Sequence, residues 1–278
     1  MTDFHRQVID EFRANRGRVG GYFEGASLAL LTTIGARTGR PRTSPLAYLV
    51  IDGQPVVVAS AMGSDKNPDW YHNVLRNPVV TVEFGEETHQ AIAAAPDGAE
   101  RDALFAQVVA AEPGFADYQR KTTRRIPVVT LTRIDASQVT WERGLGDFLV
   151  ESHDWLRQDL AELRRQAGRP DPELPEIRKH GLEFCAALTQ HHTGEDRGAF
   201  PMLAQRFPAL APVLTRLGEE HRVVAQLQRQ LRALVDDYRP ELQAELESLA
   251  TRLENHFRYE EHTVAAALNT LGPAPHFG

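Results

Sequence analysis

The sequence contains a single cysteine and lacks a long apolar run. Cys185 has no second cysteine in the chain for a disulfide, and the first residues, MTDFHRQVIDEFR, lack the basic start and the apolar core of a secretion signal. The most apolar segments, 46–51 and 55–61, are separated by Asp52-Gly53 and fall far short of the roughly 18 residues that cross a bilayer. We therefore expect a cytoplasmic protein without a transmembrane segment.

Positive charge is also scarce. The 31 Lys and Arg residues are outnumbered by 38 Asp and Glu residues, and the resulting net charge of -7 disfavours nucleic acid as the main partner. A content of 42% hydrophobic and 25% charged residues excludes a fibrous or largely disordered chain. The 278 residues are enough for two domains.

The residues up to about 140 alternate short β-rich runs with glycine and proline. Asp52-Gly53 is typical of a tight hairpin turn, and Pro68 suits the first position of a helix. This mixture predicts an α+β, barrel-like domain over residues 1–140. The expected strands are 28–34, 44–51, 56–61, 78–84, 89–95 and 126–134, and the expected helices are 4–12, 68–75 and 99–111.

After residue 147 the β signal stops and good helix formers dominate. Short connections between long helices force neighbouring helices to run antiparallel. We therefore expect an all-α, up-down-up-down four-helix bundle over residues 147–270. Its predicted helices are 147–168, 173–205, 210–236 and 240–270.

Each predicted bundle helix has a histidine on its apolar stripe, and two helices add a glutamate one turn later. At about 1.5 Å per residue, antiparallel packing brings all of them to one level. Any one of these histidines alone is more simply a hydrogen-bonded core residue. The set is different, because unpaired burial would cost each group a few kcal/mol or more. Two divalent cations would compensate. The set is His153, His191, Glu195, His221, His256 and Glu260.

Imidazole and carboxylate together suit iron or manganese better than calcium or magnesium, and iron is the metal we expect. His192 and His262 fall outside the stripe, so we expect them to be solvated or to support the ligands from outside. Cys185 is most simply a small buried apolar side chain.

Three segments, SHDWLR at 152–157, HHTGED at 191–196 and HFRYEE at 256–261, resemble the hemerythrin-like (HHE) cation-binding domains. The resemblance covers about residues 147–270 and implies an oxo- or carboxylate-bridged pair of iron ions held by the six residues above. Oxygen-carrying hemerythrins have a second histidine one turn after the third-helix histidine, where this chain has Ala225. We therefore expect one iron to lack a nitrogen ligand, which favours sensing or redox chemistry with oxygen, peroxide or nitric oxide over reversible oxygen carriage.

Two polar clusters stand out in the first half. The turn TTIGARTGRPRTSPL at 32–46 carries three arginines, whose guanidinium forks suit a phosphate or a polycarboxylate, although such a turn can also be an inert surface hairpin. The second cluster, ASAMGSDKNPDWY at 59–71, ends in Trp70 and Tyr71. These two rings either stack on a planar ligand or anchor the core.

In this order, with the segment 73–78 and a closing strand at 126–129, the clusters resemble the deazaflavin-dependent nitroreductase family over about residues 15–134. The resemblance implies a split β-barrel that binds coenzyme F420 and transfers hydride to quinones, nitroimidazoles and similar acceptors. Split barrels often pair through their sheets, which is compatible with a homodimer. Carried over by position, Arg37, Thr38 and Arg42 would hold the phosphate and acidic tail of the coenzyme, and Pro45, Leu46, Ser60, Trp70 and Asn73 would border the tail or the ring.

The family often has a tyrosine where this chain has Ala47 and a lysine where it has Ala61. Phe115 and Tyr118 fall where members of the family place aromatic rings on the substrate side, so the resemblance implies Tyr118 as the residue that orients the acceptor. Hydride transfer requires chiefly a rigid slot, so the lack of a catalytic triad does not argue against an enzyme. We expect an F420-dependent oxidoreductase fused to a di-iron bundle. Two alternatives stay open: a non-enzymatic oxygen or iron sensor whose barrel only binds F420, and a barrel that binds flavin mononucleotide or heme.

Overall fold

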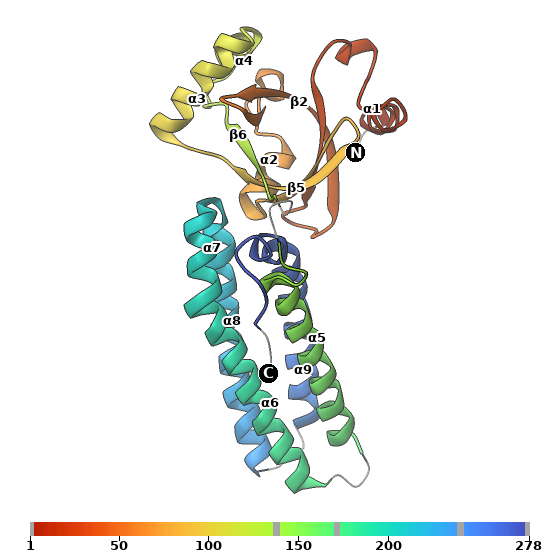
Figure 1. Ribbon diagram of the computed structural model, residues 1–278, viewed down its shortest axis with the longest axis vertical. Coiled ribbons are helices and arrows are strands. Elements are labelled where there is room, and N and C mark those ends of the chain that lie inside the picture. The colour runs from red at the N-terminus through yellow and green to blue at the C-terminus, as the bar shows by residue number, and fades with distance from the viewer. Residues whose placement is uncertain (1–2, 136–139, 170–172, 238–241, 276–278) are drawn as a thin grey trace. The chain divides into compact units, whose positions relative to one another are not determined.

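The computed structural model describes residues 3–135, 140–169, 173–237 and 242–275. It divides into two compact units, Met1–Ile134 and Asp135–Gly278. The first unit is a β-barrel with short helices, and the second is a bundle of long helices (Figure 1). Both parts of the predicted fold class are therefore confirmed. The predicted start of the fourth bundle helix, residue 240, lies outside the described residues.

Six antiparallel strands close into a barrel in the order β1-β2-β3-β6-β5-β4. Asp52 and Gly53, with φ of 50° and 78°, form the predicted hairpin turn between β2 and β3. The inside of the barrel is filled mainly by alanine and valine side chains, which suit its narrow interior. The strands are β1 (Leu28–Ile34), β2 (Pro41–Ile51), β3 (Gln54–Val58), β4 (Val79–Phe84), β5 (Glu87–Ala94) and β6 (Val128–Arg133).

Short helices cover two apolar patches on the outside of the barrel. Phe12 of the first helix packs with Leu28 and Leu30, and Val108 of the third helix packs with Val56 and Val128. The fourth helix was not predicted, because none of its residues is buried and it therefore has no apolar stripe. Pro68 is the N-cap of the second helix rather than its first residue. The helical segments are α1 (Asp3–Ala14), η1 (Gly21–Phe23), η2 (Ala61–Gly63), α2 (Asp69–Arg76), α3 (Gly98–Ala111) and α4 (Gly114–Arg120).

The second unit contains four antiparallel helical rods, in which α5 packs on α6 and α9, and α8 packs on α6 and α9 (Figure 1). Leucine side chains from these helices fill the core away from the histidines, and Cys185 is fully buried among them as expected. None of the described helices is long and apolar enough to span a membrane. The elements are α5 (Leu145–Ala167), α6 (Leu174–Gly194), η3 (Glu195–Ala199), α7 (Phe200–Arg206), η4 (Pro208–Leu210), α8 (Ala211–Asp237) and α9 (Leu242–Leu268).

The second rod is not the uniform helix that the sequence predicts over 173–205. Between α6 and α7 the chain makes one π-helical turn, η3. A π turn adds one residue to the local repeat and so changes which side chains face the interior, and such turns are frequent at functional sites. Here the turn begins at Glu195, which is buried, while the next residue, Asp196, lies at the rim of the bundle interior.

The start of α5 and the end of α9 lie against each other. Gly146 has no side chain because a Cβ there would lie 1.9 Å from the carbonyl oxygen of Ala265. Beyond the helix ends, Gly144 pairs with Pro273 in an antiparallel bridge, and Leu145 N donates to Gly272 O at 3.0 Å. The segments leading into and out of the bundle are thereby tied together.

Candidate metal and coenzyme sites

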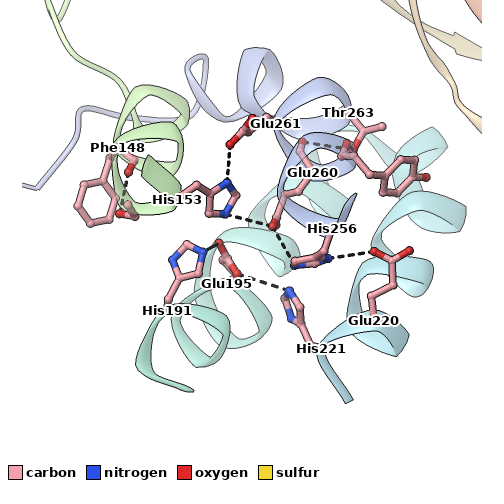
Figure 2. A network of polar contacts seen from close by, with 12 residues as sticks. Phe148, His153, His191, Glu195, Glu220, His221, His256, Glu260, Glu261 and Thr263 are labelled. Carbon is pink, nitrogen blue, oxygen red and sulfur yellow. Dashed lines mark hydrogen bonds and ion pairs between the residues drawn. The ribbon is translucent and has the colours of Figure 1, made fainter. Parts of the chain in front are cut away.

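Five histidines and two glutamates converge inside the bundle. Figure 2 shows all of them except His192. They form two groups, within each of which the ligand atoms lie within 4.8 Å of one another. His153 comes from α5, His191 and His192 from the end of α6, Glu195 from η3, His221 from α8, and His256 and Glu260 from α9. The first group is His153, His191, Glu195 and Glu260, and the second is His192, His221 and His256.

All six sequence-predicted ligands are therefore brought together at one level of the bundle. The expectation that His192 is solvated was wrong, because its side chain is buried and its ring stands beside those of His221 and His256. The expectation that Ala225 leaves a nitrogen missing therefore also changes, because His192 brings a third imidazole to that group. His262, by contrast, is exposed.

The two glutamates lie between the two histidine groups. Glu260 Oε2 is 3.5 Å from His153 Nε2 and 3.3 Å from His256 Nε2. Glu195 Oε1 is 2.9 Å from His191 Nε2, and its Oε2 is 3.6 Å from His221 Nε2. Each carboxylate thus faces one histidine of each group.

None of these inward-facing atoms has a hydrogen-bond partner among the described residues. This holds for Nε2 of all five histidines and for both carboxylate oxygens of Glu195 and Glu260. Even the 2.9 Å approach of His191 to Glu195 lacks hydrogen-bond geometry. Buried polar groups nearly always have a hydrogen-bond partner. A cluster of buried nitrogen and oxygen atoms without such partners is therefore well suited to binding metal ions.

The outer nitrogens of three histidines are held by carboxylates. Nδ1 of His153 lies 2.9 Å from Glu261, Nδ1 of His221 lies 2.9 Å from Asp196, and Nδ1 of His256 lies 2.9 Å from Glu220. Each carboxylate accepts a hydrogen bond from Nδ1–H, and the Nε2 lone pair is then left facing the interior. Metal-binding histidines in proteins are oriented in the same way.

Without metal, the cluster avoids charge. Burial raises the pKa of Glu260 to about 8, and the nearby Glu195 adds to the shift. Burial likewise raises the pKa of Glu195 well above its usual range. It lowers the pKa of His191 and of His221 to about 4 each, with the neighbouring His256 adding to both shifts. A bound cation would reverse this balance for the carboxylates, because it stabilises their ionised form.

In the barrel, three exposed arginines surround the turn between β1 and β2. None of Arg37, Arg40 and Arg42 forms an ion pair within the described part of the chain. Gly35 N donates to Arg40 O at 2.9 Å, and a Cβ on Gly35 would lie 2.6 Å from Thr38 Oγ1, so the Thr38 side chain folds over the turn. The donor chemistry fits a phosphate or carboxylate ligand.

The side chain of Asn73 joins this turn to α2. Its Oδ1 accepts from Ala36 N at 2.9 Å, and its Nδ2 donates to Thr33 Oγ1 at 3.0 Å. Both ends of the buried amide are therefore used within the protein, and Asn73 positions the arginine turn. Its predicted contact with the coenzyme stays a prediction.

The other predicted coenzyme residues lie around the barrel. Pro45 is buried, and Leu46 and Ser60 are half-buried. Trp70 is 7% exposed and packs in the barrel core. Of the two roles that the sequence allowed for this ring, this position fits that of a core anchor. Tyr118 of α4 is half-buried, with its ring edge-on to Phe115.

The loop that follows β3 has an unusual backbone. Ala61, Met62 and Gly63 have φ of 45°, 55° and 87°, whereas the backbone of Ser60 is in the right-handed helical region. A right-handed residue followed by a left-handed one turns successive N–H groups toward one point, and such concavities bind anions. No described residue accepts a hydrogen bond from the N–H groups of Ser60, Ala61 or Met62.

One arginine holds this loop, and sequence reasoning missed it. Arg124 donates to Ser64 O at 2.7 Å, Ser60 O at 2.8 Å, Ala59 O at 3.1 Å and Asn67 Oδ1 at 2.6 Å. No short-range pattern marks such a residue, because its partners lie about 60 positions earlier in the chain. The Arg124 side chain thus stabilises a strained turn that a non-glycine backbone otherwise avoids.

The two halves of the chain match different families of known proteins. Residues 4–133 match the family model of F420H(2)-dependent quinone reductase, and residues 145–268 match the hemerythrin HHE cation binding domain. Over 126 residues the chain is 36% identical to F420H(2)-dependent quinone reductases from two strains of Mycobacterium tuberculosis, covering 44% of this chain and 85% of theirs. A solved F420-H2 dependent reductase is 39% identical, covering 38% of this chain and 93% of its own, with a TM-score of 0.35.

Proposed function

Because this chain belongs to the F420H(2)-dependent quinone reductase family and carries a hemerythrin HHE cation-binding domain, we propose that it transfers hydride from reduced F420 to a quinone- or nitro-type acceptor and holds two iron ions. The proposal for the barrel is carried by the three unpaired arginines at the β1–β2 turn, together with the family relationship. The proposal for the bundle is carried by the nine unsatisfied donor atoms of its histidines and glutamates.

In the barrel, reduced F420 supplies the hydride. The arginines Arg37 and Arg42 bind its anionic tail, Asn73 fixes their turn, and Arg124 fixes the loop that contains Ser60. Tyr118 orients the acceptor. These residues bind and orient rather than exchange protons, which suits a reaction whose main requirement is contact between donor carbon and acceptor.

The barrel assignment is tested with the purified full-length protein, reduced F420 and menadione. We expect oxidation of reduced F420 that depends on both protein and menadione, and slower turnover with a nitroaromatic acceptor also supports the proposal. Tight F420 binding without turnover would instead support a non-enzymatic sensor. A yellow or red protein that binds flavin mononucleotide or heme and not F420 would contradict the coenzyme assignment.

In the bundle, the five Nε2 atoms and the two carboxylates would hold the iron ions, which would supply redox chemistry with oxygen, peroxide or nitric oxide. The phenylalanine rings stacked on the cluster exclude water: Phe257 lies 4.0 Å from the ring of His153, and Phe200 lies 5.5 Å from that of His221. Metal analysis of protein produced with iron should give close to two irons per chain, and His191→Ala should lower that number. A zinc-filled or empty bundle would contradict the di-iron assignment.

We further propose that the bundle responds to an oxidant while the barrel supplies reducing equivalents. Reduced F420 donates two electrons at once, whereas iron accepts them singly, so a quinone is the expected intermediary. The experiment compares oxygen- or peroxide-dependent oxidation of reduced F420 by iron-loaded protein, with and without menadione, and by the His256→Ala variant. Equal rates for both proteins under all conditions would refute this link and leave the two separate assignments intact.

A further inference from the structure

Two of the carboxylates that hold histidine ligands are themselves held by arginines. Glu261 Oε1 accepts from Arg157 Nη1 at 2.9 Å and lies 2.9 Å from Nδ1 of His153. Glu220 Oε1 accepts from Arg216 Nε at 2.7 Å, and its Oε2 lies 2.9 Å from Nδ1 of His256. The bundle thus contains two units of the form histidine, carboxylate, arginine, and Figure 2 shows the inner part of each.

Each arginine is also fixed by an aromatic ring next to the site. The guanidinium carbon of Arg157 lies 5.4 Å from the centre of the Phe257 ring, which is stacked on His153 at 4.0 Å. That of Arg216 lies 3.6 Å from the Tyr259 ring, one residue before Glu260. Cation–π contacts of this kind restrict a guanidinium group to one plane.

The two units serve different histidine groups. His153 belongs to the group with His191, and His256 belongs to the group with His192 and His221. The third oriented histidine, His221, contacts Asp196, whose side chain is 44% exposed and has no arginine partner among the described residues. Each histidine group therefore has one arginine-supported member.

We propose that Arg157 and Arg216 are positioning residues of the metal centre, each holding one carboxylate so that one histidine per ion presents its Nε2 lone pair to the interior. This proposal rests on the bundle binding two ions. It makes a specific claim beyond that function: the arginines act on different ions. Loss of Arg157 lowers the affinity of the His153 group for its ion, and loss of Arg216 lowers the affinity of the His256 group for its ion.

The simpler interpretation is that these arginines only tie helices together. Arg157 does bind Glu254 of α9 at 2.8 Å, in addition to Glu261. The chain offers a matched control for this, because Arg164 of α5 also pairs with a glutamate of α9, Glu247. No hydrogen bond or ion pair joins Arg164 to a histidine in the described part of the bundle. Arg164→Met removes a helix-to-helix ion pair of the same kind without touching the metal centre.

The experiment is anaerobic titration of the full-length, metal-free protein with ferrous iron against a competing chelator. Cobalt(II) is titrated in parallel, because its absorption spectrum reports the ligand geometry. The variants are Arg157→Met, Arg216→Met and Arg164→Met, since methionine keeps an apolar stem against the neighbouring ring. We expect the wild type and Arg164→Met to bind two ions alike. Arg157→Met and Arg216→Met should each bind one ion about 10- to 100-fold more weakly and the other normally.

The conservative variants separate positioning from bulk stability. Arg216→Lys keeps the charge but loses the fork, and should recover part of the affinity. Glu220→Gln should reproduce the loss seen in Arg216→Met, and it serves as the second variant if Arg216→Met does not fold. The metal-free variants should melt no lower than Arg164→Met does.

Three results would overturn the proposal. The first is unchanged affinity for both ions in Arg157→Met and Arg216→Met, and the second is an equal loss of affinity in Arg164→Met. The third is that Arg157→Met and Arg216→Met lower the affinity for the same ion. A wild-type protein that fails to bind two ions would refute the proposed di-iron function itself. The two failures are therefore distinguishable.

Discussion

The imidazole rings of His192 and His221 are stacked, with their centroids 4.0 Å apart and their planes inclined by 11°. His192 follows directly after His191 in α6, and the two adjacent histidines face different groups of the site. Successive residues on a helix point about 100° apart, so both reach the interior only because the site lies in the wide centre of four helices. The stacked pair gives the second group three imidazoles.

The first prediction follows from that arrangement. His192→Ala should remove one nitrogen donor from the second group and reduce the metal content from about two ions per chain toward one, with the ion near His153 retained. Metal analysis after removal of loosely bound ions is the measurement. His262→Ala is the control, since His262 is exposed and should not affect metal content.

A second prediction concerns pH and the metal-free protein. Glu260 has its folded pKa raised to about 8, so between pH 4.5 and 8 the native state keeps a proton that the unfolded state has lost, and stability falls as pH rises. The pKa values of His191 and His221 are lowered to about 4, so these two histidines make stability rise with pH, but only below about pH 6.5. Stability of the bundle should therefore fall between pH 6.5 and 8, by about 1.4 kcal/mol per pH unit for each carboxylic acid that stays protonated.

Denaturant unfolding followed by helical circular dichroism at several pH values in this window checks the prediction. Glu260→Gln should flatten the slope, because an amide does not titrate. Iron-loaded protein should show the opposite trend, since metal binding requires ionised carboxylates and strengthens as pH rises. A metal-free protein whose stability rises steadily from pH 6.5 to 8 would contradict the protonated state of Glu260.

The third prediction concerns Arg124 and the loop after β3. Arg124→Met removes four hydrogen bonds to residues 59–67 and should release the left-handed turn at Ala61 and Met62. A charged hydrogen bond contributes about 1.5 to 3 kcal/mol, so we expect KM for reduced F420 to rise by about 10-fold or more, with kcat less affected. Steady-state kinetics with menadione at varied F420 concentration give both values.

Arg125→Met is the matched control for this experiment. The side chain of Arg125 is 64% exposed, and it pairs with Asp102 at 3.6 Å, which lies on α3 and not in the loop. Its removal should leave KM for reduced F420 unchanged. If Arg124→Met and Arg125→Met change KM for reduced F420 equally, Arg124 does not act by holding the loop.

The fourth prediction compares two glycines in bundle helices. Gly146→Ala places a methyl group against the carbonyl oxygen of Ala265 and should destabilise the bundle by about 1 to 3 kcal/mol or more, because α5 and α9 must separate. Gly218 of α8 has nothing within 4 Å of a Cβ position, so Gly218→Ala should stabilise the bundle by about 0.5 to 1 kcal/mol. Thermal unfolding should shift in opposite directions for the two variants.

The helical repeat explains how much of the site could be predicted from the sequence. His153, His221 and His256 recur among leucines at spacings of three and four, and Glu260 follows one turn after His256, so the stripe alone placed them inside. The barrel strands followed from their β-branched runs and the Asp52-Gly53 turn.

The remaining features depend on tertiary structure. The position of His192 depends on the width of the bundle interior, and the π turn at Glu195 carries no local sequence signal that separates it from a helix. The hydrogen bonds of Arg124 join segments that are adjacent only after β3 and β6 have paired. Periodicity cannot detect contacts of this kind, because it describes one element at a time.

The bridge between Gly144 and Pro273 places the first and last segments of the bundle side by side. A domain whose two ends meet can be joined to a host protein at a single surface loop, or opened elsewhere and closed here by a short peptide, without stretching its helices. Such circular permutation should preserve the histidine layer. The same geometry makes this helical module easy to transplant between unrelated polypeptides.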